Sequence, residues 1–223
     1  MLPTQRYTTS IAALIIANLV PLFGVLYLGW ETVDILFIYW FESLIIGIFN
    51  VLKMLFTNMF DQPNQPVKLR IIANILLFPV KLLTILFFIV HYGGFMLGHG
   101  FFLLFLFAHV PESVFESPAT ILPYVIDLVL KLKIAIFSLF ISHGISFAKN
   151  FFFNSEGKNN RESDFFLNPY KRIIIMHITI VLCAGITMAT GQNIFALVGL
   201  ITIKTIADLW AHLQERQRFN QPG

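Results

Sequence analysis

The residues best able to do chemistry in this chain are histidines and an aspartate inside long apolar segments. Ionisable groups are costly in a lipid bilayer, so each one marks a candidate functional site. His91, His143 and His177 each interrupt a different apolar run. Asp208 and His212 lie four residues apart in the last run, a spacing that places both side chains on one face of a helix. These five residues are the first candidates for a shared site.

Neutral imidazoles and carboxylates are the usual protein ligands of zinc. The sequence therefore predicts a zinc site with the ligands His91, His143, His177, Asp208 and His212. A catalytic zinc lowers the pKa of its bound water towards neutrality. In such an enzyme Ser142 would orient the substrate, and Glu42 or Asp208 would act as the catalytic proton carrier. The first hypothesis is thus an intramembrane hydrolase of a lipid-like substrate.

The rise of a helix gives each polar residue an expected depth. Counted from the predicted inner ends of the helices, one group lies roughly 7 to 15 Å deep. Its members are Asn50, His91, His143, His177 and Asp208. Glu42 and His99 lie higher, at about 20 and 27 Å by the same count. The sequence therefore predicts one polar layer in the inner half of the bilayer.

The same residues allow three other hypotheses. Glu42, Lys204 and Asp208 could line the path of a transporter or proton-coupled carrier, which at this size would act as a homo-oligomer. Histidines on facing helices could be the axial ligands of a haem. The polar layer could also be structural only, with His143 bonding to neighbouring helices and Lys204 paired with Asp208.

Composition decides where these residues must be placed. The chain has 223 residues, of which 57% are hydrophobic and 12% charged, and its mean hydropathy is +0.78. Soluble domains carry roughly a quarter charged residues, and a small core cannot hide 25 Phe. A soluble fold is therefore excluded. The net charge of +3 is expected to mark membrane edges and not a nucleic-acid partner.

Segment lengths predict an all-α integral membrane protein with six transmembrane helices. A span needs about 20 apolar residues. The stretch Val67–Phe107 is about twice as long as one span. We expect Pro79 and Lys81 to divide it into an interfacial helix over 67–78 and a span after it. A single membrane domain would then cover residues 1–223. Its predicted spans are 10–28, 33–56, 81–107, 121–150, 169–189 and 193–213.

Positive charges support this topology. With both termini cytoplasmic, the outer side receives Lys131 and Lys133 only. The inner side receives Arg6, Lys53, Lys68, Arg70, Lys81, Lys149, Lys158, Arg161, Lys171, Arg172, Arg216 and Arg218. This excess agrees with the positive-inside rule. A seven-span alternative, split at His91-Tyr92-Gly93-Gly94, would place most of these charges outside.

Several motifs resemble those of a family of prokaryotic multi-pass membrane proteins catalogued as a domain of unknown function. They are Tyr39-Trp40-Phe41-Glu42-Ser43, Asn50-Val51-Leu52-Lys53-Met54, His91-Tyr92-Gly93-Gly94-Phe95, His99-Gly100, Ser142-His143-Gly144, Met176-His177 and Lys204-x-x-x-Asp208-x-x-x-His212-x-x-Glu215. The resemblance covers nearly the whole chain. It implies a multi-pass protein of the prokaryotic cytoplasmic membrane and carries no reaction with it.

The candidate site is also loosely similar to those of the ceramidase and adiponectin-receptor type of intramembrane zinc hydrolases. Those sites resemble this one in having three histidines, an aspartate and a serine near the cytoplasmic face. This chain departs from them in its six predicted spans instead of seven. It also has Asp208-x-x-x-His212 where they carry paired histidines. The likeness implies zinc as cofactor and a lipid-like substrate taken from the bilayer, by analogy only.

Overall fold

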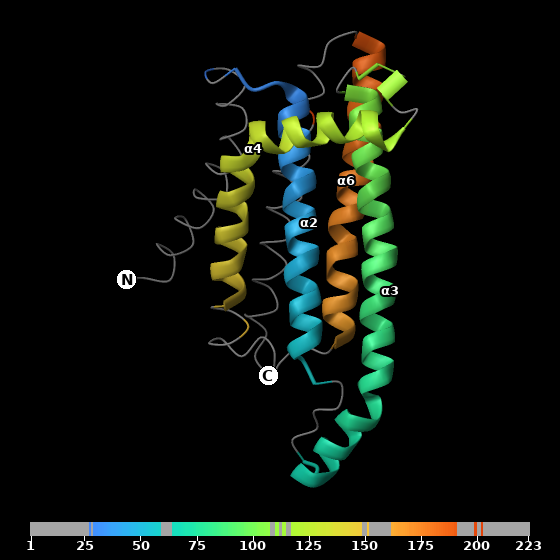
Figure 1. Cartoon of the computed structure of the whole chain (residues 1–223). Helices are drawn as coiled ribbons and strands as arrows, with labels where there is room; N and C mark the ends of the chain where they lie inside the picture. The colour runs from blue at the N-terminus through green and yellow to red at the C-terminus, as the bar shows by residue number, and fades with distance from the viewer. Residues whose placement is uncertain are drawn as a thin grey trace, which may run out of the picture. The chain divides into compact units, whose positions relative to one another are not determined.

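The described part of the chain is helical. The computed structural model describes residues 29–58, 64–107, 117–148 and 162–190, together with the isolated positions 27, 110, 111, 113, 114, 151, 199 and 202. Four long helices lie in these ranges (Figure 1): α2 (Thr32–Phe56), α3 (Val67–Phe107), α4 (Pro118–Phe147) and α6 (Glu162–Thr190). No strand occurs among these residues. The predicted all-α class is confirmed for this part of the chain.

The chain divides into two compact units. Residues 37–174 form one unit, and residues 1–36 with 175–223 form the other. In the first unit, α2 and the second half of α4 run in one direction, and α3 and the beginning of α6 run in the opposite one (Figure 1). The first part of α4 runs roughly perpendicular to its second half (Figure 1). The single domain expected over 1–223 stays a prediction.

Helix α2 is the centre of the first unit because three helices pack against it. Its buried residues lie on more than one side of the helix: Phe41, Ile45 and Phe49 follow one stripe, and Ser43, Asn50 and Met54 lie on another side. Rings on α2 and α4 meet, with the centroids of Phe49 and Phe140 5.3 Å apart. A helix buried on several sides belongs to a core and not to a surface. Residues on α2 are therefore placed to join neighbouring helices.

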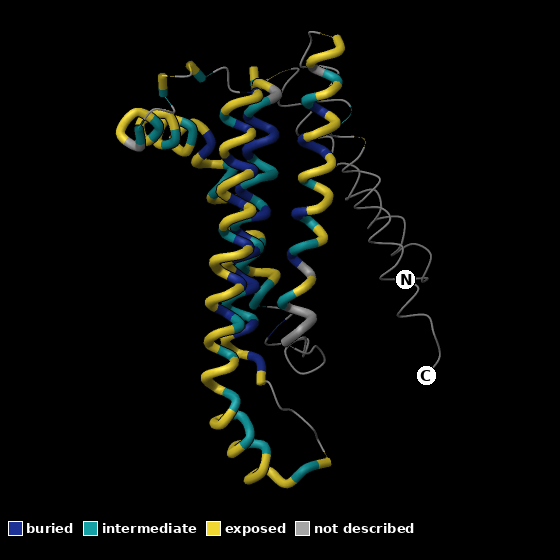
Figure 2. Tube along the Cα trace, turned by 90° about the vertical axis from the view of Figure 1, so that its right-hand side faces the viewer, coloured by how far each residue is buried: buried dark blue, intermediate teal, exposed yellow. Residues whose placement is uncertain are grey.

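Helix α3 buries only one stripe. Its buried residues recur at three- and four-residue steps, as expected for one helix face. They are Ile85, Phe88, Tyr92, Met96, His99, Gly100, Leu103 and Phe107. Large apolar side chains cover the remaining surface, for example Leu97 at 73% exposed and Val90 at 67%, and Figure 2 shows this exposed band along α3. Such a contiguous apolar surface suits contact with lipid and not with water.

Helix α3 is not divided at Pro79. It runs without interruption through 41 residues and contains Pro79 in its interior. Proline removes one backbone bond and bends a helix without always ending it, and Figure 1 shows the first part of α3 leaning away from the rest. The separate interfacial helix over 67–78 is therefore wrong as an independent element. The helix also continues through His91-Tyr92-Gly93-Gly94, so the structure contains no break there for a seventh span.

A lysine side chain ties the bent helix to the end of α2. Lys81 Nζ donates to the backbone oxygens of Leu55 at 2.6 Å and Thr57 at 2.8 Å. Carbonyl groups at a helix C-terminus lack partners within the helix and carry partial negative charge. The Lys81 ammonium therefore caps α2 and fixes it against α3 just after the bend.

Three described segments are long and apolar enough to cross a membrane. They are Val33–Phe56, Val67–Phe107 and Pro169–Thr190. These segments indicate a membrane location. The predicted count of six spans is not supported, since α4 is not among the three. The predicted spans 10–28 and 193–213 lie outside the described residues except for positions 27, 199 and 202.

Helix α6 begins earlier than its sequence suggests. Asn168-Pro169 was expected to start the helix, but α6 starts at Glu162 and keeps Pro169 in its interior. The acidic residues Glu162 and Asp164 come first, followed by Phe165 and apolar neighbours. Acidic residues favour a helix N-terminus because they balance its partial positive charge. The residues after Pro169 therefore lie well inside a helix.

In the second unit, the start of α2 is held by its own side chain. The backbone N–H of Glu31 donates to Asp34 Oδ2 at 2.9 Å, the backward half of a capping box. The Asp34 side chain is buried, at 1% exposed. Cys183, the one cysteine of the sequence, is buried in the described part of α6.

Candidate functional site

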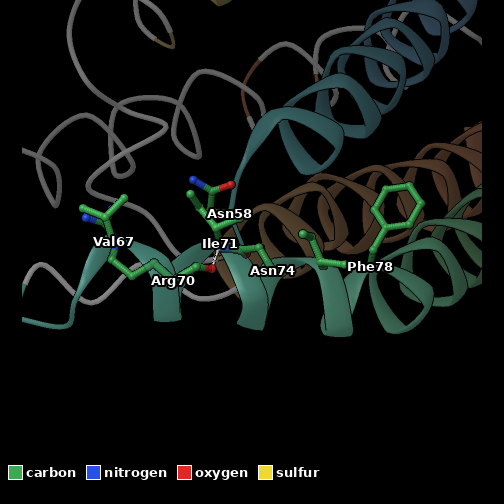
Figure 3. Close-up of a pocket in the computed structure, with 7 residues that line it drawn as sticks. Asn58, Val67, Arg70, Ile71, Asn74 and Phe78 are labelled. Carbon is green, nitrogen blue, oxygen red and sulfur yellow. Dashed lines mark hydrogen bonds between the residues drawn. The ribbon is translucent and has the colours of Figure 1, made fainter.

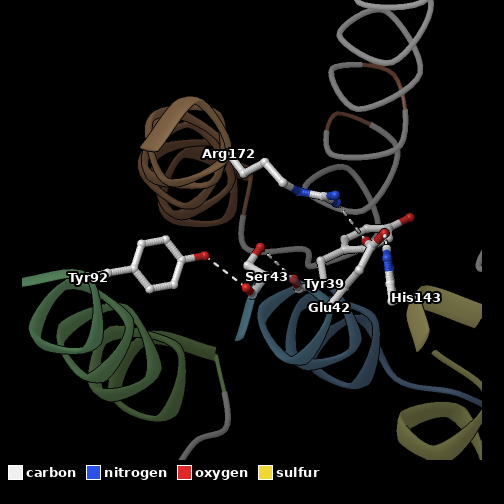
Figure 4. A network of polar contacts seen from close by, with 6 residues as sticks. All are labelled: Tyr39, Glu42, Ser43, Tyr92, His143 and Arg172. Atoms are coloured by element: carbon white, nitrogen blue, oxygen red, sulfur yellow. Dashed lines mark hydrogen bonds and ion pairs between the residues drawn. The ribbon is translucent and has the colours of Figure 1, made fainter. Parts of the chain in front are cut away.

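Three charged or titratable side chains from three helices meet in the first unit (Figure 4). Arg172 Nη2 of α6 lies 3.0 Å from Glu42 Oε2 of α2. His143 Nε2 of α4 lies 3.6 Å from the other carboxylate oxygen, Glu42 Oε1. The side chain of Glu42 is 16% exposed, that of His143 26% and that of Arg172 35%. We call Glu42, His143 and Arg172 the charged triad.

Arg172 is the member of the triad that the sequence did not identify. It was assigned to the basic residues of the cytoplasmic edge, and it lies in the first turn of the candidate span Pro169–Thr190. Because α6 begins at Glu162 and not at Pro169, Arg172 lies almost three helical turns from the start. The acidic residues and the apolar Phe165 before Asn168 were the available signal, because together they favour an earlier helix start.

The predicted depth of Glu42 is also wrong relative to His143. Glu42 lies near the middle of α2, whereas His143 lies within the last two turns of α4. Their contact shows that the two helices do not end at one level. Counting residues from predicted helix ends therefore separated two side chains that the structure brings together.

A neutral seam joins the opposite face of α2 to α3. Trp40 Nε1 donates to the Met96 carbonyl at 2.7 Å, and Tyr92 OH donates to the Ser43 carbonyl at 2.8 Å (Figure 4). Each ring also lies against a glycine: a Cβ built on Gly47 would lie 2.5 Å from Tyr92 Cε1, and one on Gly100 would lie 3.0 Å from Trp40 Cζ2. We call these contacts the α2–α3 seam.

His91 lies in an aromatic cluster and not in the triad. Its Nδ1 shares a hydrogen bond of 2.9 Å with the hydroxyl of Tyr170 on α6. The ring of Phe87 stacks on His91 with centroids 5.1 Å apart, and Phe95 meets it edge-on at the same centroid distance. The structure therefore brings His91 and His143 to different partners.

The structure does not bring the other polar candidates of the first unit, His99, Asn50 and Ser142, into the charged triad. His99 is buried, and its Nδ1 donates to the carbonyl of Phe95 at 2.7 Å, one turn earlier. This bond satisfies the ring locally, in agreement with a packing histidine. Asn50 is buried and Ser142 is exposed. The proposed role of Ser142 in orienting a substrate stays a prediction.

The zinc site is not tested by this structure. Among the described residues, no three His, Cys, Asp or Glu side chains converge as metal ligands would. His177 is exposed on α6 and belongs to the second unit. Asp208 and His212, with Lys204 and Glu215, lie outside the described residues. The ligand set His91, His143, His177, Asp208 and His212 therefore stays a prediction.

Comparison with known proteins places the chain in a family. No curated protein matches the chain, and no solved structure matches it. The model of the family of unknown function DUF6498 matches residues 1–223. The similarity expected from the sequence motifs, to a domain of unknown function, is thereby confirmed. The chain belongs to this family, DUF6498, over its whole length.

Proposed function

We propose that this protein is a small proton-coupled membrane carrier in which Glu42 and His143 handle the proton. The observation that supports this proposal is the contact of one carboxylate, Glu42, with both His143 and Arg172. These three residues lie on helices of a strongly apolar chain, where ionisable groups commonly serve proton and substrate pathways. The proposal is the second of the hypotheses drawn from the sequence, with Arg172 added.

The chemistry of the three groups differs in a useful way. Arginine is always protonated and acts as a fixed cation. Histidine gains and loses its proton near neutral pH. A carboxylate becomes neutral when it accepts a proton. A proton passed from His143 to Glu42 would cancel the charge that holds Arg172. The donors of Arg172 would then become available to another anion.

Such an exchange gives the helices two arrangements. With Glu42 ionised, α2, α4 and α6 are joined through one carboxylate. With Glu42 protonated, the attraction to Arg172 is lost and the helices are free to separate. A carrier needs two states whose populations depend on proton and substrate. The charge of Glu42 would couple protonation to the change between these two states.

The other hypotheses remain predictions that the same experiments can address. A zinc hydrolase depends on Asp208 and His212, which lie outside the described residues. Among the described residues no contact favours a haem or a zinc over the carrier. A purely structural triad is the main rival, because ion pairs between helices can also serve packing alone.

The test is transport by the purified full-length protein in liposomes. Currents are recorded on solid-supported membranes while small organic anions, inorganic anions and cations are applied across a range of pH. We expect at least one solute to give a pH-dependent current that Glu42→Gln abolishes. Glu31→Gln is the matched control, since Glu31 undergoes the same change on an exposed residue at the start of α2.

A structural triad gives a different result. In that case no solute produces a current, and Glu42→Gln changes only the temperature of unfolding in detergent. Measurement of bound zinc and of the absorption spectrum on the same preparation tests the metal and haem hypotheses. About one zinc per chain, lost in His177→Ala with His212→Ala, would favour the hydrolase over the carrier.

A further inference from the structure

A pocket with both polar and apolar walls lies beside the first part of α3 (Figure 3). Its volume is about 560 Å³. The residues that line it are Asn58, Val67, Arg70, Ile71, Asn74, Ile75 and Phe78. The amide of Asn74 donates to the Arg70 carbonyl at 2.9 Å, which fixes the two residues on adjacent turns (Figure 3). Neither the charged triad nor the α2–α3 seam contributes a residue to this pocket.

The charge pattern of α3 places this pocket at the edge of the hydrocarbon layer. Residues 82–107 contain no Asp, Glu, Lys or Arg, and at 1.5 Å per residue they cover about 39 Å, enough to cross the apolar core. The preceding part of α3 carries Lys68, Arg70 and Lys81. Residues 67–81 therefore extend beyond the apolar core to the level of the lipid headgroups.

The lining suits a ligand with an anionic head and an apolar body. Arginine presents five N–H donors in a planar fork that matches phosphate oxygens. Among the described residues, those that line the pocket include one cation, Arg70, and no carboxylate. On the apolar side, Ile71 is 55% exposed, Ile75 66% and Phe78 53%. A free phosphate ion would leave these apolar groups without a partner.

We propose that this pocket binds an anionic phospholipid of the membrane. The phosphate group is held by Arg70 with the amides of Asn58 and Asn74, and the acyl chains lie along Ile71, Ile75 and Phe78. This site is independent of the proposed carrier activity. It would fix α3 at its bend to the surface of the membrane leaflet that the positive-inside rule assigns to the cytoplasm.

The experiment uses the full-length protein in neutral detergent. Binding of phosphatidylglycerol and of phosphatidylcholine is titrated by native mass spectrometry for the wild type, Arg70→Gln and Lys68→Gln. Lys68→Gln is the matched control, since Lys68 is an exposed cation on the same turn of α3 that does not line the pocket. Because Asn74 bonds to the Arg70 backbone, Arg70→Gln keeps that bond, and an unchanged unfolding temperature verifies the fold.

The expected result is that the wild type prefers phosphatidylglycerol and that Arg70→Gln weakens its binding by about tenfold. Lys68→Gln should change binding by less than about twofold, as a single exposed charge does. Glycerol phosphate without acyl chains should not compete. Equal losses in both variants would mean diffuse charge attraction and overturn the pocket. Full competition by glycerol phosphate, or unchanged binding in Arg70→Gln, would overturn it as well.

Discussion

Two faces of helix α2 are built on different principles. Towards α3, the seam is neutral, with indole and phenol groups bonded to backbone carbonyls and rings pressed against glycines. Towards α4 and α6, the triad is ionic, with one carboxylate between a histidine and an arginine. The same helix therefore contacts one neighbour through close packing and neutral hydrogen bonds, and two other neighbours through charged side chains.

The difference separates packing from function. Neutral hydrogen bonds and close contacts between helices stabilise a bundle within a membrane and need no titratable group. Partly buried charges must instead offset the free energy lost on leaving water. The triad has a desolvation cost and depends on protonation, and the seam has neither property. The triad is therefore the better candidate for a functional site. We propose that the seam holds the helix in place and that the triad is the part that changes state.

The largest expected effect comes from glycine on the seam. Gly47→Ala places a methyl group 2.5 Å from the Tyr92 ring, which is bonded at Ser43 and cannot move away freely. We expect a loss of about 2 to 3 kcal/mol in the free energy of unfolding, typical of overpacking. Unfolding in detergent, followed by tryptophan fluorescence, measures this change.

Gly94→Ala is the matched control for that substitution. A Cβ on Gly94 meets nothing within 4 Å, so the variant should gain up to about 1 kcal/mol from helix propensity. A lower free energy of unfolding for Gly47→Ala and a higher one for Gly94→Ala would support a seam that depends on close packing. A loss at Gly94 as large as that at Gly47 would show that α3 has a further packing partner on its exposed face.

The next effect concerns the arginine of the triad. Arg172→Met leaves the Glu42 carboxylate without its cation, and removal of one partner from a buried pair is strongly destabilising. Since Arg172 is 35% exposed, we expect a smaller loss of about 2 kcal/mol. The double variant Glu42→Gln with Arg172→Met should recover most of this loss, because neither charge then remains.

A double-mutant cycle measures that recovery. Additive losses in the double variant would show that Glu42 and Arg172 do not depend on each other. The triad would then be two separate surface contacts, and the contrast with the seam would lose its basis.

The smallest effect is expected for single hydrogen bonds of the seam. Trp40→Phe removes the donor to the Met96 carbonyl, and Tyr92→Phe removes the donor to the Ser43 carbonyl. Each should lower the free energy of unfolding by about 0.5 to 1 kcal/mol, as for other hydrogen bonds between membrane helices. Neither should alter any pH-dependent transport current. A lost current in Tyr92→Phe would place Tyr92 within the proton pathway.

Much of the fold could be predicted from sequence, since composition and hydropathy act locally. The helices over 33–56 and 121–150 agree with α2 and most of α4, and Glu42 and His143 were both identified as intramembrane candidates. The errors in helix bounds occurred at prolines. Pro79 was expected to divide a helix and Pro169 to start one, yet both lie inside helices. A proline is compatible with either outcome, and packing of the neighbouring turns decides between them.

The sequence by itself determined that this chain is helical and apolar enough for a membrane, and which side chains carry charge. Those properties depend on residue type and on periodicity along the chain. Only the tertiary structure decided that Glu42 meets His143 and Arg172, and that His91 meets Tyr170 instead. Contacts between helices depend on where each helix begins, how far it bends and how it is rotated. Small errors in those quantities move a side chain by a full turn, so no count along the sequence could have assembled the triad.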